Sequence, residues 1–291
     1  MSDAPDTSEM HDAVETQVVV APSPISSGGR PRVRVLHLYD RYLNIYADRG
    51  NMQVLTARGA WRGIDVEVQG LEPGERFQPG EHDLIYVGGG QDRDQQMIAE
   101  RMSADLGPAI KAAVEEGTAL LAVCGGYQLL GSHYLDTTGV HQPGVGLFDL
   151  STTAGEGRLI GNVAIDAELP AIGARAACTT TIAGFENHAG RTTLGVSARP
   201  LGSVLHGNGN DGSSGFEGCR LHHAVGTYLH GPLLPRNPAL ADWLLAAALA
   251  HAHGTDAALL IDQVGTVPPA VVALEQRALE TSIARARSER G

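Results

Sequence analysis

The sequence predicts an α/β fold on a mostly parallel sheet, and three observations support this. Short apolar runs alternate with helical stretches: the runs lie at 33–38, 66–68 and 84–87, and the helical stretches at 50–62 and 93–116. Strands that alternate with helices pair in parallel, because each helix returns the chain to the same end of the sheet. The run at 119–123 is apolar throughout, as is typical of a strand buried on both faces. Gly117 ends the helical stretch before it.

Further elements are expected in the second half of the chain. Apolar runs at 158–165 and 225–229 are predicted strands, and 238–251 is a predicted closing helix. The stretch at 203–214 is rich in Gly, Asn and Ser, so we predict a mobile loop there.

The domain boundaries follow from composition. Residues 1–31 are acidic and then rich in Pro, Ser and Gly, so they cannot bury enough apolar surface to fold, and we expect a flexible tail. We place one domain over 32–265. Residues 266–291 carry an amphipathic helical pattern, and we expect a C-terminal helix that packs on the domain or on a partner.

Charge and cysteine content exclude several classes of protein. The formal net charge of −12 disfavours direct binding to nucleic acid or to an anionic membrane surface. Three cysteines, at 124, 178 and 219, suit neither a disulfide framework nor a zinc site. No signal-peptide pattern or transmembrane run is visible, so we expect a cytoplasmic protein.

The strongest chemical signal is Cys124, which directly follows the buried run. Gly125 and Gly126 come next, and a helical stretch then begins. A cysteine on such a sharp turn has a strained backbone that exposes its sulfur, and the glycines leave room for the crossing chain. The helix would also lower the pKa of the thiol. We predict that Cys124 is a nucleophile; the alternative is an ordinary buried cysteine beside a glycine turn.

A thiolate nucleophile needs a base to hold its proton and pass it to the leaving group. Among twelve histidines we choose His230, because it ends a predicted strand and enters the turn Gly231-Pro232. Active-site residues of α/β folds gather at the carboxyl ends of strands. The alternative is a strand-end histidine with a purely structural role.

Two backbone amides should stabilise the negative charge that develops on the reacting carbonyl. Gly125 offers one of them. The glycine stretch at 88–90 follows a neighbouring predicted strand, and we predict that Gly89 offers the other. A glycine stretch alone more often marks a simple turn.

These motifs resemble those of the class I glutamine amidotransferases. Cys124, Gly126 and Gln128 match the family's Cys-x-Gly-x-Gln, and Gly226 and His230 match its Gly-x-x-x-His. The resemblance implies a flavodoxin-like, three-layer α/β/α domain that hydrolyses L-glutamine and binds it near Gln128.

A pocket for free glutamine needs a fixed cation for its carboxylate. Arg158 begins a predicted strand after a glycine-rich approach, where the resembling family binds glutamine. The alternative is an exposed surface arginine.

Two positions depart from the family pattern. Ala122 replaces a glycine that many members place two residues before the cysteine. Pro232 replaces the glutamate that orients the histidine in most members. The third catalytic residue is then an acid elsewhere in this chain or one from a partner subunit, and we favour the partner.

The stretches at 38–51 and 184–192 narrow the resemblance to the cobyric-acid-synthase-like branch, and within it to GatD-type subunits. The alternative is a purely structural role: a helix cap in the first stretch and a hydrogen-bonded loop network in the second. In that group a Mur-ligase-like, MurT-type partner uses ATP and Mg to amidate the D-glutamate α-carboxyl of the lipid II stem peptide. The resemblance therefore implies cell-wall synthesis, no cofactor in this subunit, and placement at the inner face of the membrane only through partner and substrate.

Three rival hypotheses stay open. The chain could supply ammonia for corrinoid amidation, act as a catalytically silent scaffold of the same fold, or be a cysteine hydrolase or protease. We expect no metal site, since the spacing of its other histidines does not suit one.

Overall fold

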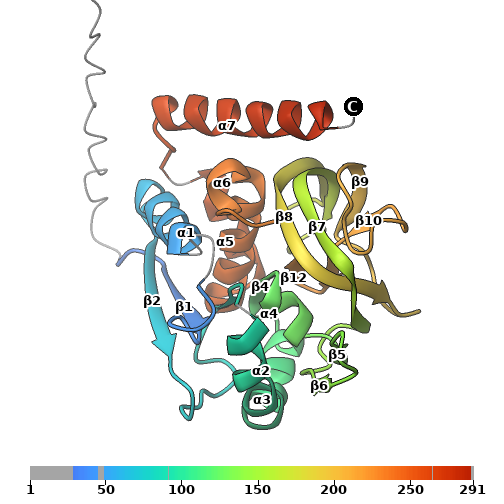
Figure 1. The fold of residues 1–291 in the computed structure, drawn as a ribbon. Helices are drawn as coiled ribbons and strands as arrows, with labels where there is room; N and C mark the ends of the chain where they lie inside the picture. The colour runs from blue at the N-terminus through green and yellow to red at the C-terminus, as the bar shows by residue number, and fades with distance from the viewer. Residues whose placement is uncertain (1–28, 45–48, 91, 264, 290–291) are drawn as a thin grey trace, which may run out of the picture.

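The first sheet carries the predicted parallel strands (Figure 1). In the computed structural model, which describes residues 29–44, 49–90, 92–263 and 265–289, its order is β11-β12-β4-β3-β1-β2. The strands are β1 (Arg32–Leu38), β2 (Asp65–Leu71), β3 (Leu84–Val87), β4 (Ala119–Val123), β11 (Cys219–Leu221) and β12 (Ala224–Thr227). All neighbours pair in parallel except β11, which is antiparallel at the edge. The parallel strands thus follow the order 2-1-3-4-5 of the flavodoxin-like fold that the family resemblance implied.

Helices lie between these strands or follow the last of them, and the predicted helices at 50–62 and 238–251 are present. They are α1 (Arg49–Trp61), α2 (Asp92–Arg101), α3 (Gly107–Glu115), α4 (Gly125–Leu129), α5 (Pro238–His253), α6 (Leu260–Gln263) and α7 (Pro269–Ser288). The stretch predicted as one helix at 93–116 is divided by a π-helical turn, Met102–Leu106, before α3. Pro108 explains the break, because proline lacks the N–H that would continue the helical bonding.

A second sheet, not predicted from the sequence, lies beside the first (Figure 1). Its strands are β5 (His133–Leu135), β6 (His141–Pro143), β7 (Leu150–Leu169), β8 (Cys178–Leu194), β9 (Gly202–His206) and β10 (Phe216–Glu217). The long antiparallel pair β7–β8 forms its centre. The predicted strand at 158–165 is only the middle of β7. The strand β8 was missed because its inward positions include Glu186 and His188, so the usual alternation of apolar and polar residues is hidden.

The prediction of a loop at 203–214 is wrong for residues 203–206. Its first part is strand β9, and the carboxylate of Glu186 accepts hydrogen bonds from the backbone amides of Asn208 and Gly209, at 2.8 and 2.9 Å. Glycine-rich composition indicates backbone freedom, but these long-range bonds remove it.

The C-terminal helix α7 packs on the chain's own body (Figure 1). At one end Glu275 pairs with the buried Arg58 of α1. Near the other end Ala286 packs against Ala164 of β7 and Ala183 of β8. Helix α7 therefore joins both parts of the fold. Within the described ranges no helix is long and apolar enough to cross a bilayer, and the tail predicted at 1–31 falls almost wholly outside them.

Candidate active site

Cys124 occupies the sharp turn between β4 and α4. Its backbone angles, φ 51° and ψ −107°, lie in a region that residues other than glycine rarely adopt. Such a conformation costs about 1–3 kcal/mol and persists only where neighbours enforce it. Here its amide donates to the carbonyl of Thr227, at 2.8 Å, at the end of the adjacent strand β12. The strained turn is therefore held by the next strand of the sheet.

The glycines after Cys124 allow another loop to approach. A Cβ on Gly126 would lie 2.6 Å from the carbonyl oxygen of Val87 and 2.8 Å from that of Gly88. A Cβ on Gly125 would lie 3.0 Å from the amide nitrogen of Gly90. The glycine loop at 88–90 thus lies against the cysteine turn, as the oxyanion prediction requires. The assignment of the Gly89 and Gly125 amides as donors stays a prediction.

His230 lies just past the carboxyl end of β12, the strand beside β4. A backbone pair joins it to Phe185 of β8, with N···O distances of 3.0 and 3.2 Å. Gly226 earlier on β12 lies against Tyr127, because a Cβ there would lie 2.2 Å from the tyrosine ring. Cys124 and His230 therefore follow adjacent parallel strands at the same edge of the sheet.

The electrostatic surroundings keep His230 neutral. The pKa of His230 is lowered from its ordinary 6.5 to about 4, mostly by burial and then by the electrostatic effects of His188, Arg158 and Arg236. A neutral imidazole is the form that can accept a proton from a thiol.

Arg158 lies on β7. It is close enough to His230 for its charge to lower the pKa of that imidazole. It is exposed, and its guanidinium donates to the side-chain oxygen and the backbone oxygen of Asn187, both at 2.6 Å. These bonds fix the cation in place without neutralising it. This position suits a group that binds the carboxylate of an amino acid.

Gln128 is buried, and its side-chain amide is bonded within the protein. It accepts from Gln95 of α2 at 3.0 Å and donates to the hydroxyl of Tyr228 at 3.1 Å. Gln95 also donates to the carbonyl of Gly125, at 3.1 Å. The side chain of Gln128 therefore supports the cysteine turn, and its predicted contact with the substrate stays a prediction.

Residues 34–238 match the family model of the CobB/CobQ-like glutamine amidotransferase domain. The chain belongs to this family. The resemblance proposed from Cys124, His230 and the flanking stretches is thereby confirmed, and the chain carries a glutamine amidotransferase domain.

Curated relatives agree with this membership. The chain is 37% identical over 214 residues to a protein of Staphylococcus aureus (strain N315) named lipid II isoglutaminyl synthase (glutamine-hydrolyzing) subunit GatD, covering 74% of this chain and 83% of that protein. It is 35% identical over 228 residues to the protein of the same name from Streptococcus pneumoniae (strain ATCC BAA-255 / R6), covering 77% and 84%. It is 29% identical to a cobyric acid synthase of Limosilactobacillus reuteri (strain DSM 20016), covering 57% of this chain and only 32% of that longer protein.

The amidotransferase domain holds other polar groups near the site. Glu186 and His188 are buried on β8, so this predicted polar stretch forms a packed network. The companion stretch at 38–51 is only partly visible, because residues 45–48 lie outside the described part of the chain. In the part that is described, no group of three or more His, Cys, Asp or Glu side chains could hold a metal ion.

Replacing Gly126 with alanine should damage the turn. The new methyl group would meet two backbone oxygens that cannot move aside, so we expect a loss of about 1–3 kcal/mol in the free energy of unfolding. Urea denaturation measures this loss. Gly107→Ala is the matched control, because a Cβ on this buried glycine meets nothing closer than 3.6 Å. Equal stability of the two variants would contradict the close packing.

The pH profile of glutamine hydrolysis should report the low pKa of His230. Because its pKa is about 4 and not 6.5, the imidazole stays unprotonated through mildly acidic pH. We expect the acid limb of kcat/KM for the chain alone to lie near pH 4. Steady-state rates in buffers from about pH 3 to pH 8 check this, with the fold verified at each pH. A limb near pH 6.5 would show that His230 is not the buried base described here.

Proposed function

We propose that this chain is the glutamine-hydrolysing subunit of a lipid II isoglutaminyl synthase. The observation that carries the proposal is the strained cysteine turn at Cys124, beside the strand that leads to His230, in a chain that spans over 80% of the length of two relatives bearing that name. The ammonia would be used by an ATP-dependent, MurT-type synthetase subunit to amidate the D-glutamate α-carboxyl of the stem peptide. ATP and Mg would bind to that partner.

The proposed chemistry is acyl transfer through a thioester. Arg158 binds the carboxylate of L-glutamine, and the Cys124 thiolate attacks the side-chain amide carbon. The amides of Gly89 and Gly125 stabilise the oxyanion. His230, which has taken the thiol proton, gives it to the departing nitrogen, and ammonia leaves. His230 then removes a proton from water, which attacks the thioester and releases glutamate.

The third catalytic group would come from the synthetase. Pro232, at the family's glutamate position, has no side-chain acceptor that could orient His230. The positive charges around His230 would be offset by a carboxylate delivered on assembly. We therefore expect the isolated chain to hydrolyse glutamine about a hundredfold or more slowly than the complex does. Comparable rates with and without the partner would contradict this assignment.

The decisive experiment uses the full chain co-expressed with Mur-ligase-like proteins from its own genome. Amidated lipid II is measured by mass spectrometry with glutamine and ATP, and reactions without ATP are the control. Amidation that requires both subunits supports the proposal. Glutamine hydrolysis without lipid II amidation would keep the glutaminase and reject the pathway. Cobyric acid synthesis is the second candidate, which amidation of a cobyrinic acid substrate would reveal.

A further inference from the structure

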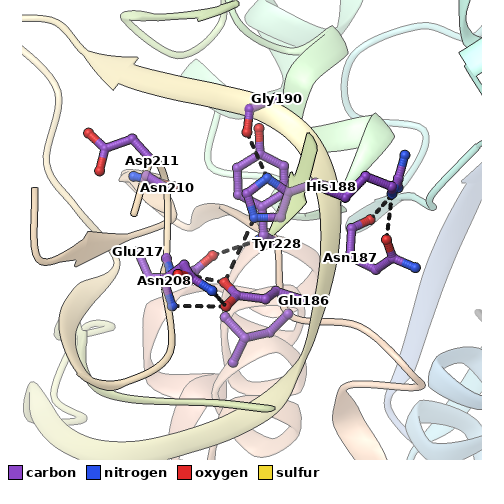
Figure 2. A network of polar contacts seen from close by, with 12 residues as sticks. Glu186, Asn187, His188, Gly190, Asn208, Asn210, Asp211, Glu217 and Tyr228 are labelled. Atoms are coloured by element: carbon purple, nitrogen blue, oxygen red, sulfur yellow. Dashed lines mark hydrogen bonds and ion pairs between the residues drawn. The ribbon is translucent and has the colours of Figure 1, made fainter. Parts of the chain in front are cut away.

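A buried polar cluster gathers around His188, between strand β8 and the residues that follow β12 (Figure 2). Glu186 and His188 come from β8, and Tyr228 follows β12; their exposed fractions are 0%, 1% and 0%. None of them has a role in the chemistry proposed above. Burying such groups costs free energy unless they are hydrogen-bonded or paired with an opposite charge, so the contacts of this cluster need an explanation.

The contacts of His188 define its protonation. Its Nδ1 lies 2.7 Å from the carbonyl oxygen of Gly190, which can only accept, so Nδ1 carries a hydrogen. Among the described residues no hydrogen-bond partner reaches Nε2, which lies 3.8 Å from a carboxylate oxygen of Glu186. Glu186 already accepts bonds from Asn208 and Gly209, as expected for an ionised carboxylate. A proton on Nε2 would turn this contact into an ion pair.

The imidazole of His188 also lies flat on the ring of Tyr228, with centroids 3.6 Å apart and planes 6° apart (Figure 2). The hydroxyl of Tyr228 accepts from Gln128 at 3.1 Å and bonds to Thr192 at 2.6 Å. Gln128 belongs to the helix that starts at Cys124, and Tyr228 precedes His230 by two residues. The stacked pair thus contacts the helix that begins after Cys124, and it lies on the segment that leads to His230.

We propose that His188 is a positioning residue. Gly190 and Glu186 hold its imidazole, which stacks on Tyr228 and so fixes the Cys124 turn relative to His230. This inference rests on the proposed glutaminase function. It assigns a role to the 184–192 stretch that the nucleophile and base do not explain.

Charge adds a second effect. After burial, His188 is the largest cause that lowers the pKa of His230, because a proton on Nε2 would place a positive charge beside that imidazole; Arg158 of β7 and Arg236 of the 3-10 turn Leu234–Arg236 contribute less. Two carboxyls face the cluster: Glu186, and Glu217 of β10, whose pKa burial raises to about 8. Removing the charge of His188 should move the titration of His230 to higher pH.

The test compares His188→Ala and His188→Phe in the full chain with its synthetase. We expect His188→Ala to lower kcat for glutamine hydrolysis about tenfold to a hundredfold, with KM nearly unchanged, because the reacting groups are misplaced. Its acid limb should also move to higher pH. Phenylalanine can stack on Tyr228 without charge, so His188→Phe should recover much of kcat and keep the shifted limb. His141→Ala is the control, since His141 also stacks on a ring, that of His133, on the β5–β6 hairpin.

Each outcome decides the inference. A folded His188→Ala with wild-type kcat and an unmoved acid limb would overturn it. It would also be overturned if both variants lost kcat in proportion to a lower melting temperature while the acid limb of the pH profile stayed in place. If His188→Ala does not fold, the acid limb of His188→Phe decides. A wild-type complex without glutamine hydrolysis would instead reject the proposed function itself.

Discussion

Replacing Cys124 with alanine should abolish glutamine hydrolysis, with a fall in rate of at least about a thousandfold, because the thioester cannot form. Lipid II amidation supported by glutamine should disappear with it. Amidation supported by added ammonium salts should persist, since the synthetase step does not need the thiol. The measurements are glutamate release from glutamine, and amidated product with each nitrogen source.

The chain supplies its own control for this prediction. Cys178 is exposed at the start of β8, away from the cysteine turn, and Cys178→Ala should hydrolyse glutamine at the wild-type rate. Stability also needs to be compared, because Cys124 is strained and alanine would occupy the same backbone conformation. A Cys124→Ala chain that still hydrolyses glutamine would remove the nucleophile assignment and with it the proposed mechanism.

Replacing Arg58 with alanine should cause the largest loss of stability, about 3–5 kcal/mol in the free energy of unfolding. Arg58 is 3% exposed and makes two bonds to Asp242 of α5, at 2.7 and 2.8 Å. It also pairs with Glu275 of α7. Without the guanidinium, both carboxylates lose their main partner. Among the residues that the structure describes, only Arg62 still reaches Asp242, at 2.8 Å.

Urea denaturation followed by circular dichroism measures this loss. The matched control is Arg32→Ala, because the ion pair of Arg32 with Glu67 is exposed on both sides, with side-chain fractions of 61% and 56%. An exposed pair contributes at most about 1 kcal/mol. A loss of that small size for Arg58→Ala would show that α7 is not held by the buried charges.

The Arg58→Ala replacement should also change KM for glutamine. Helix α7 packs on β7 and β8, and Glu289, after its end, accepts a bond from the backbone amide of Asn162 on β7 at 2.7 Å. Arg158, the proposed carboxylate ligand, lies on the same strand. Loosening α7 through Arg58→Ala should therefore raise KM for glutamine before it affects the cysteine turn.

Much of the parallel sheet could be predicted because its signals are local. The run at 84–87 was predicted with the bounds of β3, and the run at 119–123 with those of β4. Strands buried on both faces are apolar at every position, so they stand out in the sequence. The strained turn at Cys124 was also predictable, because only small residues can follow a cysteine at so close a crossing.

The second sheet was not predictable in the same way. Strand β8 buries Glu186 and His188, whose polar side chains give no periodic apolar signal. They are stable inside the protein only because Gly190, Asn208 and the ring of Tyr228 satisfy or cover them. Asn208 and Tyr228 come from other parts of the chain, whereas Gly190 follows His188 on the same strand. A loop that composition marked as mobile is fixed by the same contacts.

The sequence by itself thus determined the parallel strands, the cysteine turn and the strand that leads to His230, because hydrophobic runs and glycines act on their immediate neighbours. Only the tertiary structure decided what surrounds that pair. It placed Arg158 on the side of His230, fixed Gln128 through Gln95 and Tyr228, and stacked His188 behind them. These contacts join residues far apart in the chain, and their free energy depends on burial and charge that exist only after folding.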